Sequence, residues 1–318
     1  KNKYYSKSYT FKGERKLSVS DNLSLGYGSD YNYNKGDFKV HGNWGSSARG
    51  HSDNLGLFTN LGYKLNDTTI LSSHLRGDKH KYSEENLTYR INATKLFDNF
   101  TLSLSESTGL RHPDLYVLHG SNPSGSYKAM KTTKAETSLT RELSVKYNLS
   151  DVISLKSTAY KGSVSDVLNR GTSTNGYNEI IDIEQEGLEN SFILKGDDQK
   201  LILSSTLSKS KEGNGRPQLR RPEKQFGINY TKKVISNFFG PFDLKYDYRH
   251  IGKVEDWKNG SVRSKVDSSD IMNLSLSKKL SKQVWSLNIF NLTDEVYQRP
   301  DTYNQERRRI SLSFNHRY

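Results

Sequence analysis

The sequence predicts an all-β protein, an antiparallel transmembrane β-barrel, and three observations support this fold class. Apolar and polar residues alternate along most of the chain, as in strands with one lipid-facing side and one polar side. Only 32% of the 318 residues are hydrophobic, yet 20 are Tyr. Disordered chains are also polar, but they are poor in aromatic residues. Short and long connections alternate between the predicted strands, which is typical of outer-membrane barrels.

The predicted strands are segments of about ten residues, the length that a tilted strand needs to cross a bilayer. In the segment 99–107, for example, Phe100, Leu102 and Leu104 share one parity, and Ser or Thr occupies the other. The alternation predicts about fifteen strands. Their centres lie near residues 12, 28, 57, 73, 90, 104, 139, 159, 188, 204, 229, 246, 274, 288 and 313. No apolar run of about 18 residues is present, so no transmembrane helix is expected.

The connections between these strands alternate in length. Short ones are predicted at 20–22, 66–68, 98–99, 148–151, 195–199, 235–240 and 280–283, and long ones at 34–50, 78–84, 111–130, 168–178, 210–222, 254–266 and 293–306. Short turns belong to the periplasmic rim and long loops to the outer rim, so the last strand runs toward the periplasm. With an odd strand count, the first strand runs the same way. Closure of an antiparallel barrel needs an even count, so at least one strand is expected before Lys1.

The charge and the cysteine content of the chain argue against several classes of function. The net charge of +13 is spread along the chain rather than gathered in one basic block, which argues against a nucleic-acid-binding protein. A basic barrel rim would instead attract the lipid phosphates of a bacterial outer leaflet. The chain has no cysteine, which excludes disulfides and thiolate metal sites. No Gly-x-Ser-x-Gly nucleophile motif is present, so an enzyme is not expected. A passive porin or an adhesin stays an alternative.

Five short motifs between residues 99 and 318 resemble, in the same order, motifs of TonB-dependent outer-membrane receptors. They lie in "STGLRHPDLYVLHGSNPSG", "EGLE", "QLRRPEKQFGINY", "NIFNLTDEVY" and the closing "RRRISLSFNHRY". Two positions depart from the family pattern, since His112 replaces its usual Ala and Arg307 its usual Gly. The matching residues are Arg111, Pro113, Asn122, Pro123, Gly187, Glu189, Leu219, Arg220, Arg221, Pro222, Asn291, Leu292, Asp294, Tyr297, Arg308 and Tyr318.

This resemblance implies a barrel of about 22 strands closed by an N-terminal plug. Residues 1–318 would form the C-terminal part of the barrel domain, without the plug and the first strands. The family function would be active uptake of a scarce large nutrient across the outer membrane. The motif spacing is most similar to that of the vitamin B12 (cobalamin) receptors, and a ferric-siderophore or haem receptor is the alternative.

The resemblance also implies partners. TonB would act through the missing N-terminal region, and the barrel assembly machinery would bind the C-terminal strand with its terminal aromatic residue. The protein would be a monomer that contacts lipopolysaccharide and binds no nucleic acid. Calcium loops of cobalamin receptors would lie before Lys1, so no cofactor and no metal site is assigned to this chain.

Seven residues on the predicted outer loops or upper strand ends are candidate ligand contacts. An aromatic ring in such a place can stack on a flat macrocycle or chelate, and packing within the loops or in an aromatic girdle is the alternative. The candidates are Tyr116, Tyr127, Arg170, Tyr177, Trp257, Tyr297 and Tyr303.

Charged residues near the same loops have two interpretations each. Arg216, Arg220 and Arg221 could attract an anionic chelate, but ion pairs with plug or wall carboxylates are favoured. Five histidines could ligate haem iron, although no spacing favours this over ordinary surface histidines. They are His41, His51, His80, His112 and His119. An acidic set is predicted to face the lumen from one strand, in ion pairs with the plug. It comprises Asp182, Glu184, Glu186 and Glu189.

Overall fold

The computed structural model describes residues 2–41, 46–121, 129–130, 134–169, 179–258 and 262–316, and most of these residues lie in strands. The elements are β1 (Lys3–Ser20), β2 (Leu23–Val40), β3 (Ser46–Asn66), β4 (Thr69–His80), β5 (Asn86–Leu96), β6 (Phe100–Arg111), α1 (Leu115–His119), β7 (Gly120–Ser121), β8 (Glu136–Asn148), β9 (Ile153–Asn169), β10 (Glu179–Lys195), β11 (Gln199–Glu212), β12 (Lys224–Ser236), β13 (Gly240–Ile251), β14 (Val254–Lys258), β15 (Val262–Val266), β16 (Ser269–Leu280), β17 (Gln283–Phe290) and β18 (Arg309–His316).

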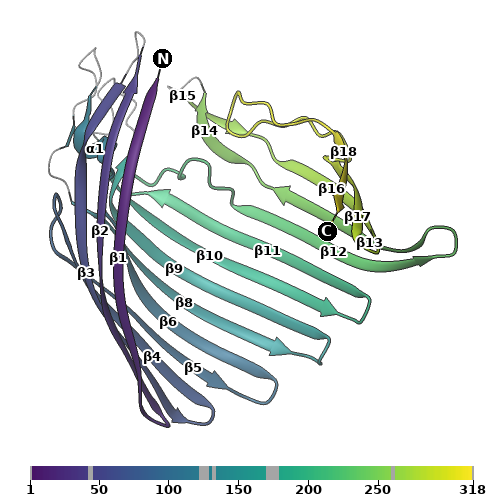
Figure 1. Cartoon of the computed structure of the whole chain (residues 1–318), viewed down its shortest axis with the longest axis horizontal. Coiled ribbons are helices and arrows are strands. Elements are labelled where there is room, and N and C mark those ends of the chain that lie inside the picture. Colours follow the sequence, from purple (N-terminus) through teal and green to yellow (C-terminus); the bar gives the residue numbers. More distant parts are fainter. Residues whose placement is uncertain are drawn as a thin grey trace.

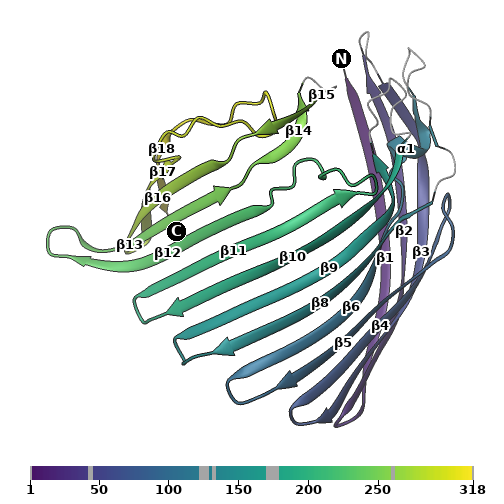
Figure 2. The ribbon, with the colours of Figure 1, turned by 180° about the vertical axis from the view of Figure 1, so that it is seen from behind.

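The main sheet is a strongly curved antiparallel wall (Figures 1 and 2). Its path runs β1-β2-β3-β4-β5-β6-β8-β9-β10-β11-β12-β13-β16-β17-β18, and β7 pairs with the outer end of β3. Each predicted strand centre lies in one strand of this path, which confirms the predicted order. Within the described residues β1 and β18 form no ladder with each other, so the sheet is open between them.

The two faces of the sheet differ in polarity because successive residues of a strand point to opposite sides. On β4, Leu71 and Leu75 are exposed on one face. On the other face, Arg76 binds Asp30 of β2 at 2.5 Å and Asp78 at 2.7 Å. The leucine face is the lipid-facing side expected of a membrane barrel, and the charged face is the inner side.

The short helix α1 packs on the inner face of β2 and β3. A side chain at Gly36 would meet Leu115, and one at Gly50 would meet His119 at 2.1 Å, so both glycines let the helix approach the wall. Val117 and Leu118 are buried. No helix among the described residues is long and apolar enough to cross a membrane.

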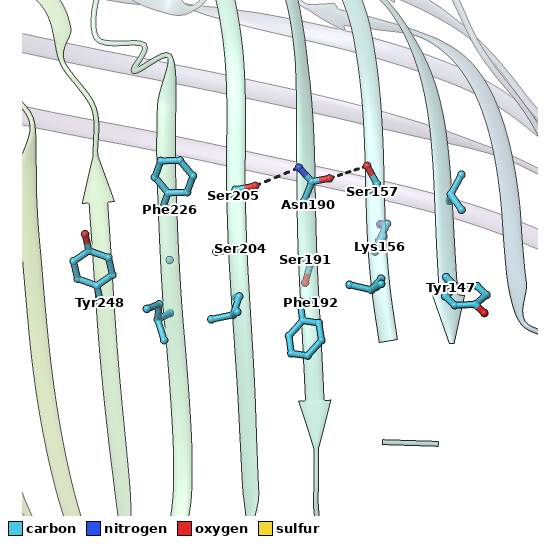
Figure 3. Close-up of a pocket in the computed structure, with 15 residues that line it drawn as sticks. Tyr147, Lys156, Ser157, Asn190, Ser191, Phe192, Ser204, Ser205, Phe226 and Tyr248 are labelled. Atoms are coloured by element: carbon cyan, nitrogen blue, oxygen red, sulfur yellow. Dashed lines mark hydrogen bonds between the residues drawn. The ribbon is translucent and has the colours of Figure 1, made fainter. Parts of the chain in front are cut away.

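A polar triplet interrupts the lipid-facing side between β9 and β11. Asn190 accepts a hydrogen bond from Ser157 (2.8 Å) and donates one to Ser205 (3.2 Å), so its amide is paired on both sides (Figure 3). Such pairing is required where no water is available. Phe192 and Phe226 flank the triplet in a surface hollow of about 590 Å³. Because these rings point outward, the hollow is not a candidate ligand site.

Two of the predicted long loops are largely strand. Residues 34–50 were expected to form a loop, but β2 continues to Val40 and β3 begins at Ser46. Their main-chain groups pair along the whole extension, from Asn34 opposite Ser52 to Val40 opposite Ser46. The second loop, 254–266, folds into the separate hairpin β14–β15.

The acidic set on β10 does not share one face, so that prediction was wrong. Glu184 and Glu186 have the outward parity of Leu188, whereas Glu189 has the inward parity. Residues three apart on a strand necessarily point to opposite faces. Asp182 lies at a β-bulge, because the pairing with β9 shifts register between Ile181 and Ile183.

The assignment of the two faces can be tested on β11 with neighbouring residues. Leu203 lies between Phe192 and Ile228 on the outward face. Leu203→Arg should lower the free energy of unfolding by about 2–4 kcal/mol, the cost of a cation near the bilayer midplane on the lipid side. The side chain at position 204 points inward, so Ser204→Arg should lower the free energy of unfolding much less. Denaturant unfolding of the complete protein in vesicles measures both, and equal losses would contradict the assignment.

Candidate functional site

The outer ends of the strands carry two separate groups of loops that contain the candidate residues. Tyr116 belongs to α1, which packs on β3. Trp257 lies on β14, and Tyr297 and Tyr303 lie in the connection between β17 and β18. The candidates therefore do not form one cluster. Tyr127, Arg170 and Tyr177 lie outside the described residues, as do the motif residues Asn122, Pro123 and Tyr318.

The α1 loop is folded onto the wall by its own sequence. Asp114 caps the helix, because its carboxylate accepts hydrogen bonds of 2.8 Å from the backbone N–H groups of Tyr116 and Val117. The motif residue Pro113 is buried next to the cap. Arg111 ends β6 in an exposed ion pair with Glu136 at 3.2 Å. These motif residues shape the loop.

Histidines gather where this loop meets β4. The rings of His80 and His112 are stacked with centroids 4.4 Å apart, and those of Tyr82 and His119 are nearly perpendicular with centroids 5.2 Å apart. Ser83 Oγ lies 3.0 Å from His112 Nδ1. Burial lowers the pKa of His112 below its ordinary value of 6.5. In the described part of the chain no group of three or more His, Asp or Glu side chains is arranged to hold a metal ion.

At the other end of the sheet, Asp256 joins three outer loops. Its carboxylate is fully buried, at 0% exposure. It accepts hydrogen bonds from Arg220 Nε (2.8 Å), from the backbone of Trp257 (2.7 Å) and from the backbone of Asp301 (2.9 Å). Arg220 therefore forms an ion pair, but its partner lies on the outer hairpin β14–β15 and not on the wall or a plug. We call the joined segments the three-loop cluster; they are 213–223, 252–258 with 262–268, and 291–308.

A second arginine, Arg263, is half-buried and reinforces the three-loop cluster. Arg263 on β15 binds both carboxylate oxygens of Glu212 at 2.6 and 2.7 Å and Glu255 at 3.2 Å. It also donates to the carbonyl of Pro217 at 2.7 Å. Its guanidinium lies 5.5 Å from the centre of the Trp257 ring, so this candidate aromatic residue takes part in loop packing.

The motif after β17 is a folded turn. Asn291 is buried with a positive φ of 51°, donates to the carbonyls of Glu295 and Glu306, and accepts from the backbone N–H of Glu295. Asp294 binds Arg307 through two hydrogen bonds of 2.9 and 2.5 Å. That partner holds the pKa of Asp294 well below its usual range. Arg307, at the position where the family usually has Gly, thus stabilises the turn.

The remaining motif residues are also structural where they are described. Gly187 leaves room for Tyr160, because a Cβ there would lie 2.6 Å from the tyrosine oxygen. Glu189 faces inward on the same strand. The backbone N–H of Leu292 donates to the Met272 carbonyl at 2.7 Å.

Three further motif residues lie in the segment before β12. Leu219 is half-buried and Arg221 is exposed. The Pro222 carbonyl accepts from Ser208 Oγ at 3.2 Å. Arg308 follows the later turn, and its backbone N–H donates to Asp294 at 2.9 Å. All of these contacts shape the wall and its loops.

Asp256, Glu212 and Arg263 were not predicted as site residues. One signal was available: acidic residues open the segment 254–266 and basic residues close it, as in a hairpin with opposite charges on its two strands. The partners from other loops could not be inferred, since they are more than 30 residues away in sequence.

The His112 environment predicts a dependence of the α1 loop on pH. A lowered pKa in the folded state means that the open state binds a proton more readily, so the packed loop loses stability as pH falls below about 6.5. Hydrogen exchange of residues 112–121 should be faster at about pH 5 than near neutral pH. His80 is buried and stacked on His112, so the double variant His80→Phe with His112→Phe should remove this difference. An unchanged difference in that variant would contradict the assignment.

The role of Asp256 can be compared with that of Asp267 in the same segment. Asp256→Ala leaves the backbone N–H groups of Trp257 and Asp301 without their acceptor, at about 1–3 kcal/mol each, so protease cleavage of the three-loop cluster should become much faster. Asp267→Ala removes only an exposed ion pair with Lys253, which contributes about 0–1 kcal/mol. Limited proteolysis of intact cells measures both, and similar cleavage rates would refute the role of Asp256.

Comparison with known proteins places this geometry in a family. Residues 1–292 match the profile of the family described as "TonB dependent receptor-like, beta-barrel". No protein among those with curated functions matches the sequence.

Solved structures share the fold at low identity. One is the FrpB iron transporter from Neisseria meningitidis, with 12% identity, a TM-score of 0.78 and coverage of 99% of this chain and 55% of that one. Another is the siderophore receptor PirA from Acinetobacter baumannii, with 17% identity, a TM-score of 0.77 and coverage of 98% of this chain and 55% of that one. A third is a mutant of the ferric enterobactin receptor PfeA from Pseudomonas aeruginosa, with 19% identity, a TM-score of 0.78 and coverage of 98% of this chain and 54% of that one. The chain spans about half the length of these structures. Because the profile covers most of its residues, the chain belongs to the TonB-dependent receptor-like β-barrel family, a family of receptors and not of enzymes.

Proposed function

We propose that the complete protein is a TonB-dependent active transporter of the bacterial outer membrane that takes up a ferric siderophore. The family match over residues 1–292 carries this proposal. The printed descriptions of the similar structures favour iron as the cargo, because they name an iron transporter and siderophore receptors. At these identities the likeness supports the fold, and the cargo is our inference.

The inner face of the wall suits an anionic chelate. Arg90 on β5 and Arg249 on β13 are exposed and have the inward parity of His74 and Asp247. Among the described residues neither arginine has an ion-pair partner. A guanidinium binds carboxylate or catecholate oxygens through a fixed fork of donors. We therefore propose these two arginines, which were not predicted from the sequence, as contacts along the uptake path.

The outer rim would provide the first contacts. Tyr303 is 65% exposed, and Tyr297 and Trp257 belong to the same three-loop cluster. On the opposite side Tyr116 is held by α1. In this proposal the cargo stacks on these rings and then passes inward when TonB, driven by the proton-motive force, shifts an N-terminal plug. Tyr127, Arg170 and Tyr177 stay proposed contacts of the same kind.

Other parts of the proposal follow from family membership. The barrel assembly machinery would recognise the C-terminal strand, and the protein would work as a monomer in contact with lipopolysaccharide, without nucleic acid. Cobalamin is the second candidate cargo, favoured by the motif spacing, and haem is the third. Calcium would be needed only if the cargo is cobalamin, in loops that precede Lys1.

Ligand titration of the complete protein tests the proposed cargo. A panel of ferric siderophores should raise the melting temperature, whereas cobalamin and haem should not. Arg90→Gln with Arg249→Gln should weaken siderophore binding at least about tenfold, because each charge-assisted hydrogen bond contributes about 1.5–3 kcal/mol. Arg15→Gln is the control, since Arg15 is exposed on the outward face of β1. Binding of cobalamin in place of the ferric siderophores would overturn the assignment of the cargo.

A further inference from the structure

The outward face of β1, β2 and β3 carries a continuous row of basic side chains near the outer rim. Lys7 on β1 lies directly opposite Lys35 on β2, and Lys35 lies directly opposite His51 on β3. Lys81 continues the row, with its Nζ 2.6 Å from His51 Nε2. We call these four residues the basic row. All three lysines are exposed.

The basic row lies at the upper border of the lipid-facing surface. The next outward row below it contains Tyr9 and Tyr33, whose ring centres are 6.3 Å apart. The row below that contains Phe11 and Leu55, which are 68% and 45% exposed. The surface thus changes from apolar residues to tyrosines and then to cations toward the rim. This order is expected where the acyl chains end and the headgroups begin.

The cations on this surface exceed the anions. A second pair, Lys3 directly opposite Lys39, lies farther toward the rim. Within the described residues no carboxylate forms an ion pair with Lys3, Lys7, Lys35 or Lys39. The acidic groups on this face have other partners.

Three acidic residues on this surface already have partners. Asp37 lies 3.8 Å from Arg49, and Glu85 lies 2.9 Å from Lys79. Asp53 accepts a hydrogen bond from the Tyr31 hydroxyl at 3.3 Å. Like charges directly opposite each other on neighbouring strands destabilise a sheet. The lysines in each facing pair therefore repel each other, and an anion bound between them would offset that repulsion.

The wall formed by β9, β10 and β11 shows a different arrangement at its upper end. Glu186 lies directly opposite Lys161 on one side and Lys209 on the other, and Glu184 lies opposite Lys211. Lysines on this wall thus face carboxylates across the strands. Of these two upper surfaces, only that of β1–β3 has lysines that face each other without a carboxylate between them.

We propose that the basic row binds the phosphate groups of lipopolysaccharide in the outer leaflet. Lys7 and Lys35 would share one phosphate between their ammonium groups, and Lys3 and Lys39 a second. The acyl chains would lie along the apolar surface below Tyr9 and Tyr33. This inference rests on the proposed outer-membrane location and adds to it a defined lipid site that is separate from the uptake path.

The experiment uses the complete protein, purified, stripped of lipid and titrated with phosphorylated or dephosphorylated lipid A. Phosphorylated lipid A should raise the melting temperature of the wild type. The double variant K7Q/K35Q should bind it at least about tenfold more weakly, since each basic side chain near an anionic surface contributes on the order of a tenfold factor or slightly less. The control K209Q/K211Q, on the wall with facing carboxylates, should bind like the wild type.

A second readout separates binding from folding. The lipid-free K7Q/K35Q protein should be at least as stable as the lipid-free wild type, because a repulsive pair is removed. The proposal is overturned if K7Q/K35Q binds phosphorylated lipid A as tightly as the wild type, or if dephosphorylated lipid A stabilises the wild type equally well. Siderophore uptake by both variants should be unchanged, and a lack of uptake in the wild type would refute the transport proposal alone.

Discussion

The whole structure depends on one constraint, which is that every main-chain N–H and C=O group of the wall must find its partner on a neighbouring strand. A lipid environment offers no water to replace a missing partner. The ladders run from β1 to β18 without a break in the described path. They fix the register, and the register in turn fixes which side chains face lipid. Lys7 opposite Lys35, Leu203 opposite Phe192 and Glu186 opposite Lys209 are consequences of that single network.

Glycines in the strands leave room for the bulky side chains of neighbouring strands. A Cβ at Gly28 would lie 2.4 Å from the Gly13 carbonyl oxygen and 2.6 Å from the Phe58 ring, so no side chain fits there. Gly187 makes the same allowance for Tyr160. Large rings therefore lie across the wall rather than projecting into the lumen. This packing stiffens a sheet that has few buried apolar residues of its own.

The outer rim is built in two ways. On the β2–β3 side, α1 is folded inward and held by apolar contacts and an Asp114 cap. On the β13–β18 side, charged residues around Asp256 and Arg263 hold the three-loop cluster together. The carboxylates of Asp256 and Glu212 are buried, and the hydrogen bonds that they accept hold the loops in one arrangement. The proposed ligand contacts at Trp257, Tyr297 and Tyr303 would thus be presented by one body, whereas Tyr116 belongs to another.

The sequence by itself determined the fifteen-strand order, the inward or outward parity of most residues and the family, because alternation with a period of two is a local property that needs no knowledge of distant contacts. It misjudged 34–50, where pairing with neighbouring strands keeps Gly and Lys extended, and it placed Glu184 and Glu186 on the wrong face. The tertiary structure alone decided which loops meet. Asp256 with Arg220, Arg263 with Glu212 and Lys7 with Lys35 are separated by 28 to 51 residues along the chain. Only the register of the strands between them brings these charges together.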